Sequence, residues 1–189
     1  MPESKRLFLA IKINASSKFQ TVFKQLKDCL LHEQIRWVNS ENLHLTLRFL
    51  GNTSIDRIEG ITKAITKAIA NEKEFSFEIQ NLGVFGSNYN PKVIWFKVFD
   101  DDILGKLETK ISTELDSEGF IKDRQNFVPH LTIARLKKLK DKSLFNNIIE
   151  KYKDIQIQNT DVKELILYES ILHKKGAEYK IIQKFNLRA

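Results

Sequence analysis

The chain is 189 residues long, with 42% hydrophobic and 29% charged side chains, so it can bury one sizeable core or the cores of two small lobes. The single cysteine, Cys29, excludes an internal disulfide, and no apolar run is long enough to span a membrane or to act as a signal peptide, so we expect a cytoplasmic protein. The formal net charge of +7 favours a polyanionic partner such as RNA, although a solvated lysine-rich surface would explain it equally well.

Alternating hydrophobic residues predict strands in the first half of the chain, and hydrophobic residues three or four apart predict helices. In chain order these patterns give a strand at residues 6–13, a helix to about residue 32, an extended piece at 36–38, a strand from residue 43 and a helix at 55–69. Residues 51–54 combine glycine with polar side chains, so we expect them to end that strand and to cap the following helix.

The second half is predicted to contain more strands than helices. We expect strands at residues 75–79, 92–99, 130–133, 155–158, 162–172 and 179–187, and helices at about 103–118 and 142–152. Residues 82–91 contain glycines and asparagines and are predicted to form a loop. The predicted fold class is α+β, a single two-lobed domain over residues 1–189, with pseudo-symmetric lobes of mainly antiparallel sheet, outer helices and a central cleft.

Two short strands carry the same unusual set of side chains. Residues 44–47 read H-L-T-L, and alternation places His44 and Thr46 on one face with two leucines on the other. The pattern returns at residues 130–133 as H-L-T-I, with His130 and Thr132 in the same positions, although the chain has only four histidines. Either histidine alone could be a hydrogen-bonded core residue, but the repetition makes the pair our candidate active site.

Two imidazoles that face each other can act as general base and general acid in the same reaction. A neutral imidazole removes a proton from water while a protonated one donates a proton to a leaving oxygen. Each threonine hydroxyl lies on the same face as its histidine and can donate a hydrogen bond to a phosphate oxygen held between them. This set supports displacement at phosphorus without a metal ion, so we expect neither a metal nor another cofactor.

The motifs and their order resemble those of a known family. The matching segments are residues 6–10, 36–38, 42–51, 82–85, 93–95, 129–135 and 167–170, with Gly176 and Tyr179. In these the chain is similar to the two-histidine phosphoesterase superfamily, and within it to the bacterial and archaeal RNA 2′,3′-cyclic phosphodiesterases, also called 2′-5′ RNA ligases. The resemblance spans nearly the whole chain.

The resemblance implies hydrolysis of a 2′,3′-cyclic phosphate at an RNA end to a 2′-phosphomonoester, with 2′-5′ ligation as a secondary reverse reaction. It implies that His44 is the general acid on the 3′ oxygen and that His130 is the general base on the attacking water. Thr46 and Thr132 would hold the non-bridging oxygens.

Four further residues lie in the matching segments outside the two H-x-T pairs. The family pattern has an arginine at Arg135, yet strict alternation turns it away from His130 unless a bulge or the strand end intervenes. Phe85 matches a family aromatic that could stack on a nucleobase or lie in the core beneath its loop. Arg48 is in phase with His44, so it could reach the site or face solvent. Trp95, like the other tryptophan, is assigned to the core.

Several alternatives remain open from the sequence. A phosphodiesterase of the same superfamily could act on small cyclic nucleotides or on 2′-5′ oligonucleotides, and a non-catalytic module could bind RNA ends. A metallohydrolase is disfavoured because no carboxylate lies at ligand spacing from either motif. Our expected partner is an RNA end that bears a 2′,3′-cyclic phosphate, and we expect the protein to act as a monomer.

Overall fold

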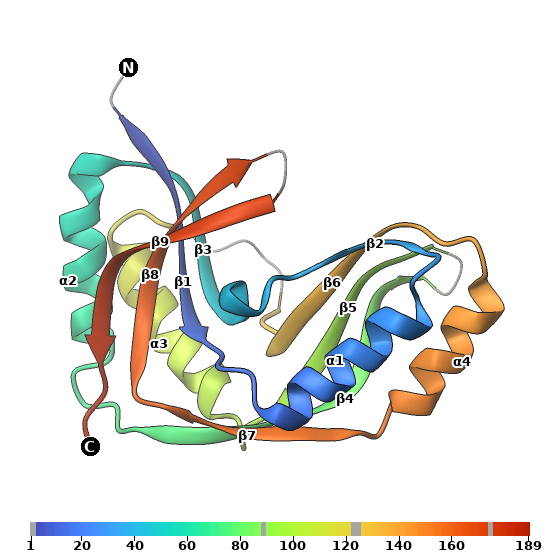
Figure 1. The fold of residues 1–189 in the computed structure, drawn as a ribbon. Coiled ribbons are helices and arrows are strands. Elements are labelled where there is room, and N and C mark those ends of the chain that lie inside the picture. Colours follow the sequence, from blue (N-terminus) through green and yellow to red (C-terminus); the bar gives the residue numbers. More distant parts are fainter. Residues whose placement is uncertain (1–2, 88–89, 122–125, 174–175) are drawn as a thin grey trace.

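The computed structural model describes residues 3–87, 90–121, 126–173 and 176–189. These residues form two antiparallel sheets, each covered by two α-helices (Figure 1). This arrangement confirms the predicted α+β fold with outer helices. Within the same residues, none of the helices combines the length and hydrophobicity needed to cross a bilayer.

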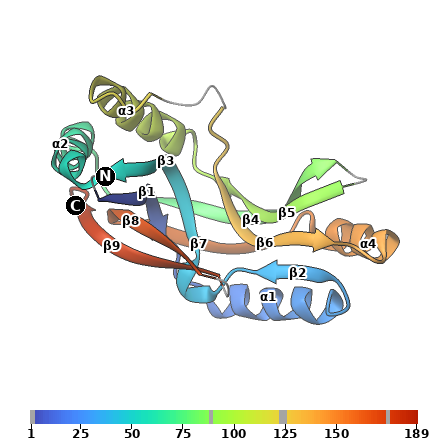
Figure 2. The same cartoon turned by 90° about the horizontal axis from the view of Figure 1, so that it is seen from above.

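The first sheet, which we call sheet A, carries the first histidine motif. Its strand order is β3-β1-β8-β9, with β1 at Ser4–Lys12, β3 at His44–Ser54, β8 at Glu164–His173 and β9 at Gly176–Asn186. Helices α2 and α3 cover one face of this sheet (Figure 2) and span Ile58–Ala68 and Ile103–Ser117. The opposite face, which these helices leave uncovered, is called the open face of sheet A below.

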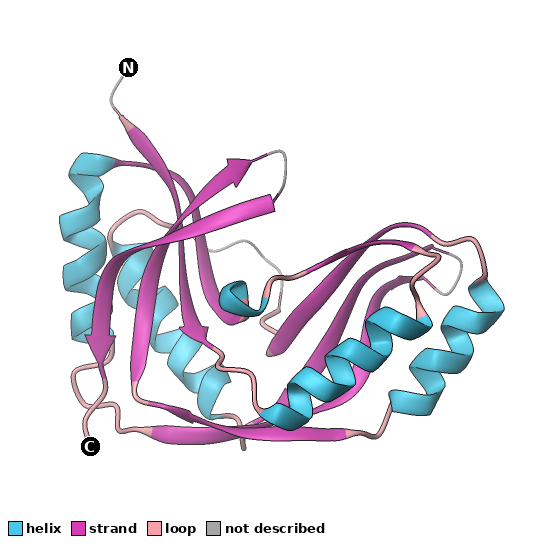
Figure 3. Cartoon of the chain, viewed as in Figure 1, coloured by secondary structure: helices cyan, strands magenta, loops and turns pink. Residues whose placement is uncertain are grey.

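The second sheet, sheet B, carries the second motif. Its strand order is β2-β6-β5-β4-β7, with bounds Gln34–Trp37, His130–Lys138, Asn90–Phe99, Phe75–Ser87 and Gln156–Val162 respectively. Helices α1, Ser17–Cys29, and α4, Lys142–Tyr152, lie on one face (Figure 3). Phe19 and Phe23 of α1 pack edge-on against Phe96 and Trp37 of the sheet, so the open face of sheet B is again the one without helices.

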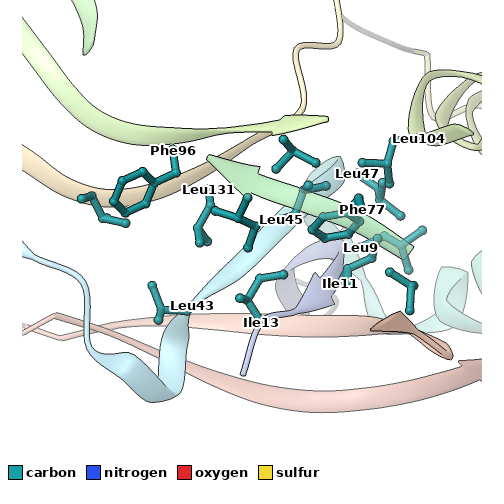
Figure 4. Close-up of a cluster of buried hydrophobic side chains, with 14 of the residues drawn as sticks. Leu9, Ile11, Ile13, Leu43, Leu45, Leu47, Phe77, Phe96, Leu104 and Leu131 are labelled. Atoms are coloured by element: carbon teal, nitrogen blue, oxygen red, sulfur yellow. The ribbon is translucent and has the colours of Figure 1, made fainter. Parts of the chain in front are cut away.

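A continuous hydrophobic core joins the two sheets to their helices. Buried side chains from β1 and β3, such as Leu9 and Leu45, belong to the same cluster as Phe96 and Leu131 of sheet B (Figure 4). These residues are the apolar members of the alternating strand patterns. Alternation therefore leaves their polar neighbours, His44 and His130 among them, on the open faces.

Most predicted elements are confirmed, and two predictions about turns are wrong. Residues 82–87 continue β4 and Asn90 and Pro91 begin β5, where a loop was expected; residues 88–89 lie outside the described residues. The positive φ angles of Asn81 and Gly86, 56° and 113°, occur where the β4–β5 register shifts, so these residues mark bulges inside a strand. Gly51 likewise has a φ of 69° within β3, which continues to Ser54.

A β-bulge follows the histidine motif in β3. Thr46 pairs with Ala10 of β1 and Arg48 pairs with Leu9, so Leu47 is the extra residue. Such an insertion moves the side chains that follow it to the face opposite the one that alternation predicts, here as far as the next register shift at Leu50. Phe49 therefore joins the face of His44 and is 65% exposed, whereas Arg48 turns to the helix-covered side and is only 6% exposed.

The buried Arg48 connects the first histidine strand to the end of α3. Its guanidinium donates to the carbonyl of Phe120 at 2.6 Å and to Asp116 Oδ1 at 3.2 Å. Both earlier interpretations of Arg48, in the site or in solvent, are wrong, because neither allows for the bulge. Since the Asp116 side chain is 44% exposed, we attribute most of the stabilisation to the buried bond with Phe120.

Replacing Arg48 by alanine is expected to lower the free energy of unfolding by about 3 kcal/mol, because it removes buried packing and leaves the Phe120 carbonyl without this donor. Urea unfolding followed by circular dichroism would measure the change. Arg188→Ala is the matched control, since that side chain is exposed and should change stability by less than about 0.5 kcal/mol. A loss below about 1 kcal/mol in Arg48→Ala would contradict this role.

Candidate active site

The two motif histidines begin the strands β3 and β6, one in each sheet. Each is half-buried on its open face, and each motif threonine is half-buried on the same face two residues later. The positive charge on protonated His130 lowers the pKa of His44, so the two imidazoles lie close enough to interact electrostatically. The structure thus brings together the residues that the repeated pattern singled out.

Both imidazoles are oriented in the same way. Nδ1 of His44 lies 2.6 Å from the carbonyl oxygen of Asn42, and Nδ1 of His130 lies 2.7 Å from that of Val128. A carbonyl oxygen only accepts hydrogen bonds, so Nδ1 carries the hydrogen in both rings. Nε2 is therefore the nitrogen that gains or loses a proton in each case.

The environment lowers the pKa of both histidines below the ordinary value of 6.5. Burial is the largest cause for His44 and for His130, while each backbone carbonyl acts in the opposite direction. The positive charge of Arg135 lowers both pKa values further. At neutral pH the free site therefore favours neutral imidazoles, and a bound phosphate would favour protonation of one of them.

Arg135 reaches this site because β6 has its own bulge. Thr132 pairs with Trp95 of β5 and Ala134 pairs with Ile94, so Ile133 is the extra residue. The bulge of β3 is equivalent, because in both strands the extra residue is the third after the motif histidine. Ala134 turns into the core and Arg135 returns to the face of His130, where it is exposed. The structure thus contains the bulge that is needed for Arg135 to share a face with His130.

Each histidine ring is packed edge-to-face against an aromatic ring. The His44 and Tyr179 ring centroids are 5.1 Å apart with an interplanar angle of 87°. For His130 and Phe85 the corresponding values are 4.8 Å and 88°. Such contacts restrict rotation of the imidazoles, so both Nε2 atoms are held in fixed directions.

Phe85 does not lie in the core beneath a loop. It belongs to β4 and stacks on Trp95 at 4.7 Å with an interplanar angle of 22°. Trp95 itself is half-buried on the open face of sheet B and lies outside the main core, so its assignment to the core is wrong. The other tryptophan, Trp37, does pack against the core as expected.

Three residues of this region were not singled out as site residues from the sequence. Tyr179 comes from β9, and its proximity to His44 depends on the pairing of β8 with β1. Phe49 lies on the face of His44 only because of the bulge. Asn42 accepts the His44 hydrogen bond through its backbone and donates its side-chain amide to the carbonyl of Ala177, which anchors β9 nearby at 2.8 Å. Asn42 and Tyr179 both lie in the segments that match the family. Nothing in the sequence pattern, however, indicated that they contact His44.

The remaining histidines lie outside this site. His32 is exposed after α1, and His173 is exposed in β8, where its Nε2 lies 3.0 Å from Glu178 Oε2. Across residues 3–87, 90–121, 126–173 and 176–189, no three His, Cys, Asp or Glu side chains are grouped so that they could hold a metal ion.

Comparison with known proteins identifies the family. The model of the 2′-5′ RNA ligase superfamily matches residues 15–172. The chain belongs to this superfamily. It is 31% identical over 185 residues to the RNA 2′,3′-cyclic phosphodiesterase of Methanocaldococcus jannaschii, covering 95% of this chain and 99% of that protein. It is 32% identical over 179 residues to the Thermotoga maritima protein of the same name, covering 94% and 92%.

Solved structures show the same fold at lower sequence identity. A protein of Thermus thermophilus matches with a TM-score of 0.79 at 21% identity, covering 97% of this chain and 98% of that one. The apo form of LigT from E. coli matches with a TM-score of 0.74 at 21% identity, covering 99% of both chains. The two-sheet architecture is therefore shared with both of these proteins.

Proposed function

We propose that this protein hydrolyses the 2′,3′-cyclic phosphate at an RNA end to a 2′-phosphomonoester, without a metal ion. The observation that carries the proposal is the pair of equivalent H-x-T strands, whose imidazoles share one orientation and interact electrostatically. The names of the M. jannaschii and T. maritima relatives support the substrate class. One chain supplies both histidines, so the proposal treats residues 1–189 as a single two-lobed unit that acts as a monomer.

The proposed reaction is an in-line displacement at phosphorus. His130 Nε2 takes a proton from water as the water oxygen forms a bond to phosphorus, and the bond from phosphorus to the 3′ oxygen breaks. His44 Nε2 donates its proton to that 3′ oxygen. The assignment of acid and base follows the family resemblance. With the 5′ hydroxyl of another RNA in place of water, the same displacement breaks the bond from phosphorus to the 3′ oxygen and forms a 2′-5′ phosphodiester, which is the ligation that the resemblance implies.

Arg135 and the two threonines are proposed to bind the non-bridging phosphate oxygens. Arg135 is exposed on the open face of sheet B and acts electrostatically on both histidines, so a phosphate between the imidazoles lies within its influence. Thr46 and Thr132 each share the face of their histidine. The exposed Phe49 and the half-buried Phe85 offer ring surfaces to the nucleoside that carries the phosphate.

Replacing Thr46 or Thr132 by valine keeps the branched shape and removes the hydroxyl. We expect kcat/KM for a short RNA ending in 2′,3′-cyclic phosphate to fall about tenfold in each variant, because one hydrogen bond to a charged oxygen is lost. The serine variants retain the hydroxyl and should lose much less. Equal activity of the valine and serine variants would show that the threonine hydroxyls do not bind the phosphate and that these residues only stabilise their strands.

Turnover by the wild-type protein tests the function itself. A short RNA with a 3′-terminal 2′,3′-cyclic phosphate is incubated with protein in the presence of excess EDTA, and the product is identified by chromatography against 2′- and 3′-phosphate standards. The proposal requires the 2′-phosphate, formed at a rate that the chelator does not change. Binding of this RNA without turnover would instead indicate a binding module, and activity that disappears with EDTA would indicate a metallohydrolase.

A further inference from the structure

Two arginines lie side by side on the open face of sheet B. Arg36 of β2 pairs directly with Arg135 of β6, and residues that pair in this way point to the same face of an antiparallel sheet. Their flanking residues confirm the orientation, because Ile35 and Trp37 pack against the core on the other face. Both arginines are exposed, so their guanidinium groups extend from neighbouring strands into the same solvent region.

This placement is unfavourable in the absence of an anion. Like charges directly opposite each other destabilise an antiparallel pair, because their Cβ atoms are only about 5 Å apart. Among the residues that the structure describes, neither guanidinium forms an ion pair or a hydrogen bond with a protein group. A pair of arginines without carboxylate partners is suited to binding phosphate groups, for which the planar guanidinium offers two parallel donors.

The two arginines differ in their electrostatic influence on the motif histidines. Arg135 lowers the pKa of both catalytic histidines, whereas Arg36 appears among the causes of neither shift. Arg36 also belongs to β2, an edge strand of sheet B, so no further strand lies beyond it in the sheet. A phosphate bound by Arg36 would therefore be a neighbour of the reacting phosphate, on the side where an RNA chain can leave the site.

We propose that Arg36 binds the phosphodiester immediately upstream of the terminal cyclic phosphate and so makes the site selective for RNA ends over cyclic mononucleotides. This inference rests on the proposed function and specifies its substrate class. A 2′,3′-cyclic mononucleotide carries a single phosphate, which Arg135 and the threonines already bind. An oligonucleotide brings a second phosphate to Arg36. The negative charge of this phosphate also offsets the repulsion between the two guanidinium groups.

The experiment compares two substrates in four proteins. kcat/KM is measured for an RNA dinucleotide or trinucleotide ending in 2′,3′-cyclic phosphate and for the 2′,3′-cyclic mononucleotide with the same base, using wild type, Arg36→Gln, Arg36→Lys and Arg188→Gln. The last variant removes the same charge from an exposed arginine in the C-terminal segment. Each measurement is repeated over a range of salt concentrations.

We expect the ratio of kcat/KM values, RNA over mononucleotide, to fall about tenfold in Arg36→Gln and to change less than twofold in Arg188→Gln. Arg36→Lys keeps the charge and should recover most of the ratio. The salt dependence for RNA should weaken by about 0.7 in log–log slope, the value for one phosphate contact on a single strand. An unchanged ratio, or an equal loss on both substrates, would overturn the inference while leaving the proposed function intact. Wild type that turns over neither substrate would refute both.

Discussion

Alanine in place of His44 or His130 is expected to lower kcat for cyclic-phosphate hydrolysis by about a thousandfold, since each variant loses one of the two proton-transfer groups. Single-turnover measurements with the short cyclic-phosphate RNA would report the chemical step. The double variant should be little slower than either single one, because acid and base act on the same transition state and their losses are not additive.

The other two histidines provide matched controls. His32→Ala and His173→Ala remove exposed imidazoles that lie outside the two motifs, so their rates should stay within twofold of wild type. A single-histidine variant that retained a tenth or more of the wild-type rate would show that the corresponding residue is not an acid or base in the reaction. Unchanged circular dichroism would exclude unfolding as the cause of a loss.

Arg135→Gln is expected to lower kcat/KM about a hundredfold, the usual consequence of removing one charged donor from a developing oxyanion. It should also move the pH dependence. A nearby positive charge disfavours protonation of an imidazole, so removing the charge of Arg135 raises the pKa of both histidines.

The direction of this pH shift follows from the two proposed roles. Activity falls at low pH as the base His130 becomes protonated, and it falls at high pH as the acid His44 loses its proton. Both limbs of the kcat/KM profile should therefore move to higher pH in Arg135→Gln, whereas Arg188→Gln should leave them in place. These limbs report the histidine pair as a unit, so the shift is measured on the whole profile. A profile that stayed in place, or moved to lower pH, would contradict an electrostatic link between Arg135 and the histidines.

Local patterns in the sequence predicted most of the fold. Helix α4, Lys142–Tyr152, coincides with the expected residues 142–152, because the spacing of its buried side chains is a purely local signal. Ser16 caps α1 by accepting a hydrogen bond from the amide of Phe19, as the polar residues before that helix indicated. The strand character of residues 82–87 was missed, because glycine and asparagine at bulges have the same composition as a loop.

The placement of the motif histidines and threonines on the open faces was predictable, but the side chains around them were only partly so. The signal for His44 and His130 is a repeated four-residue pattern, which needs no knowledge of pairing. By contrast, the positions of Arg48 and Arg135 depend on one extra residue in each strand, and a bulge is defined only by its partner strand. For the same reason the neighbourhood of Arg36 and Arg135 could not be predicted from residues almost one hundred positions apart.

The strand order of the two sheets has a consequence for synthesis of the protein. Sheet A pairs Leu7 with Glu169 and sheet B pairs Arg36 with Arg135, so each sheet combines strands from the beginning and the end of the chain. At about 5–20 residues per second, a ribosome needs several seconds or more to make the missing partners. During that time the apolar strands β1 and β3 have no complete sheet to join. Sheet A, which carries His44, is complete only after β9 has been made, so the two motif histidines reach their final arrangement near the end of synthesis.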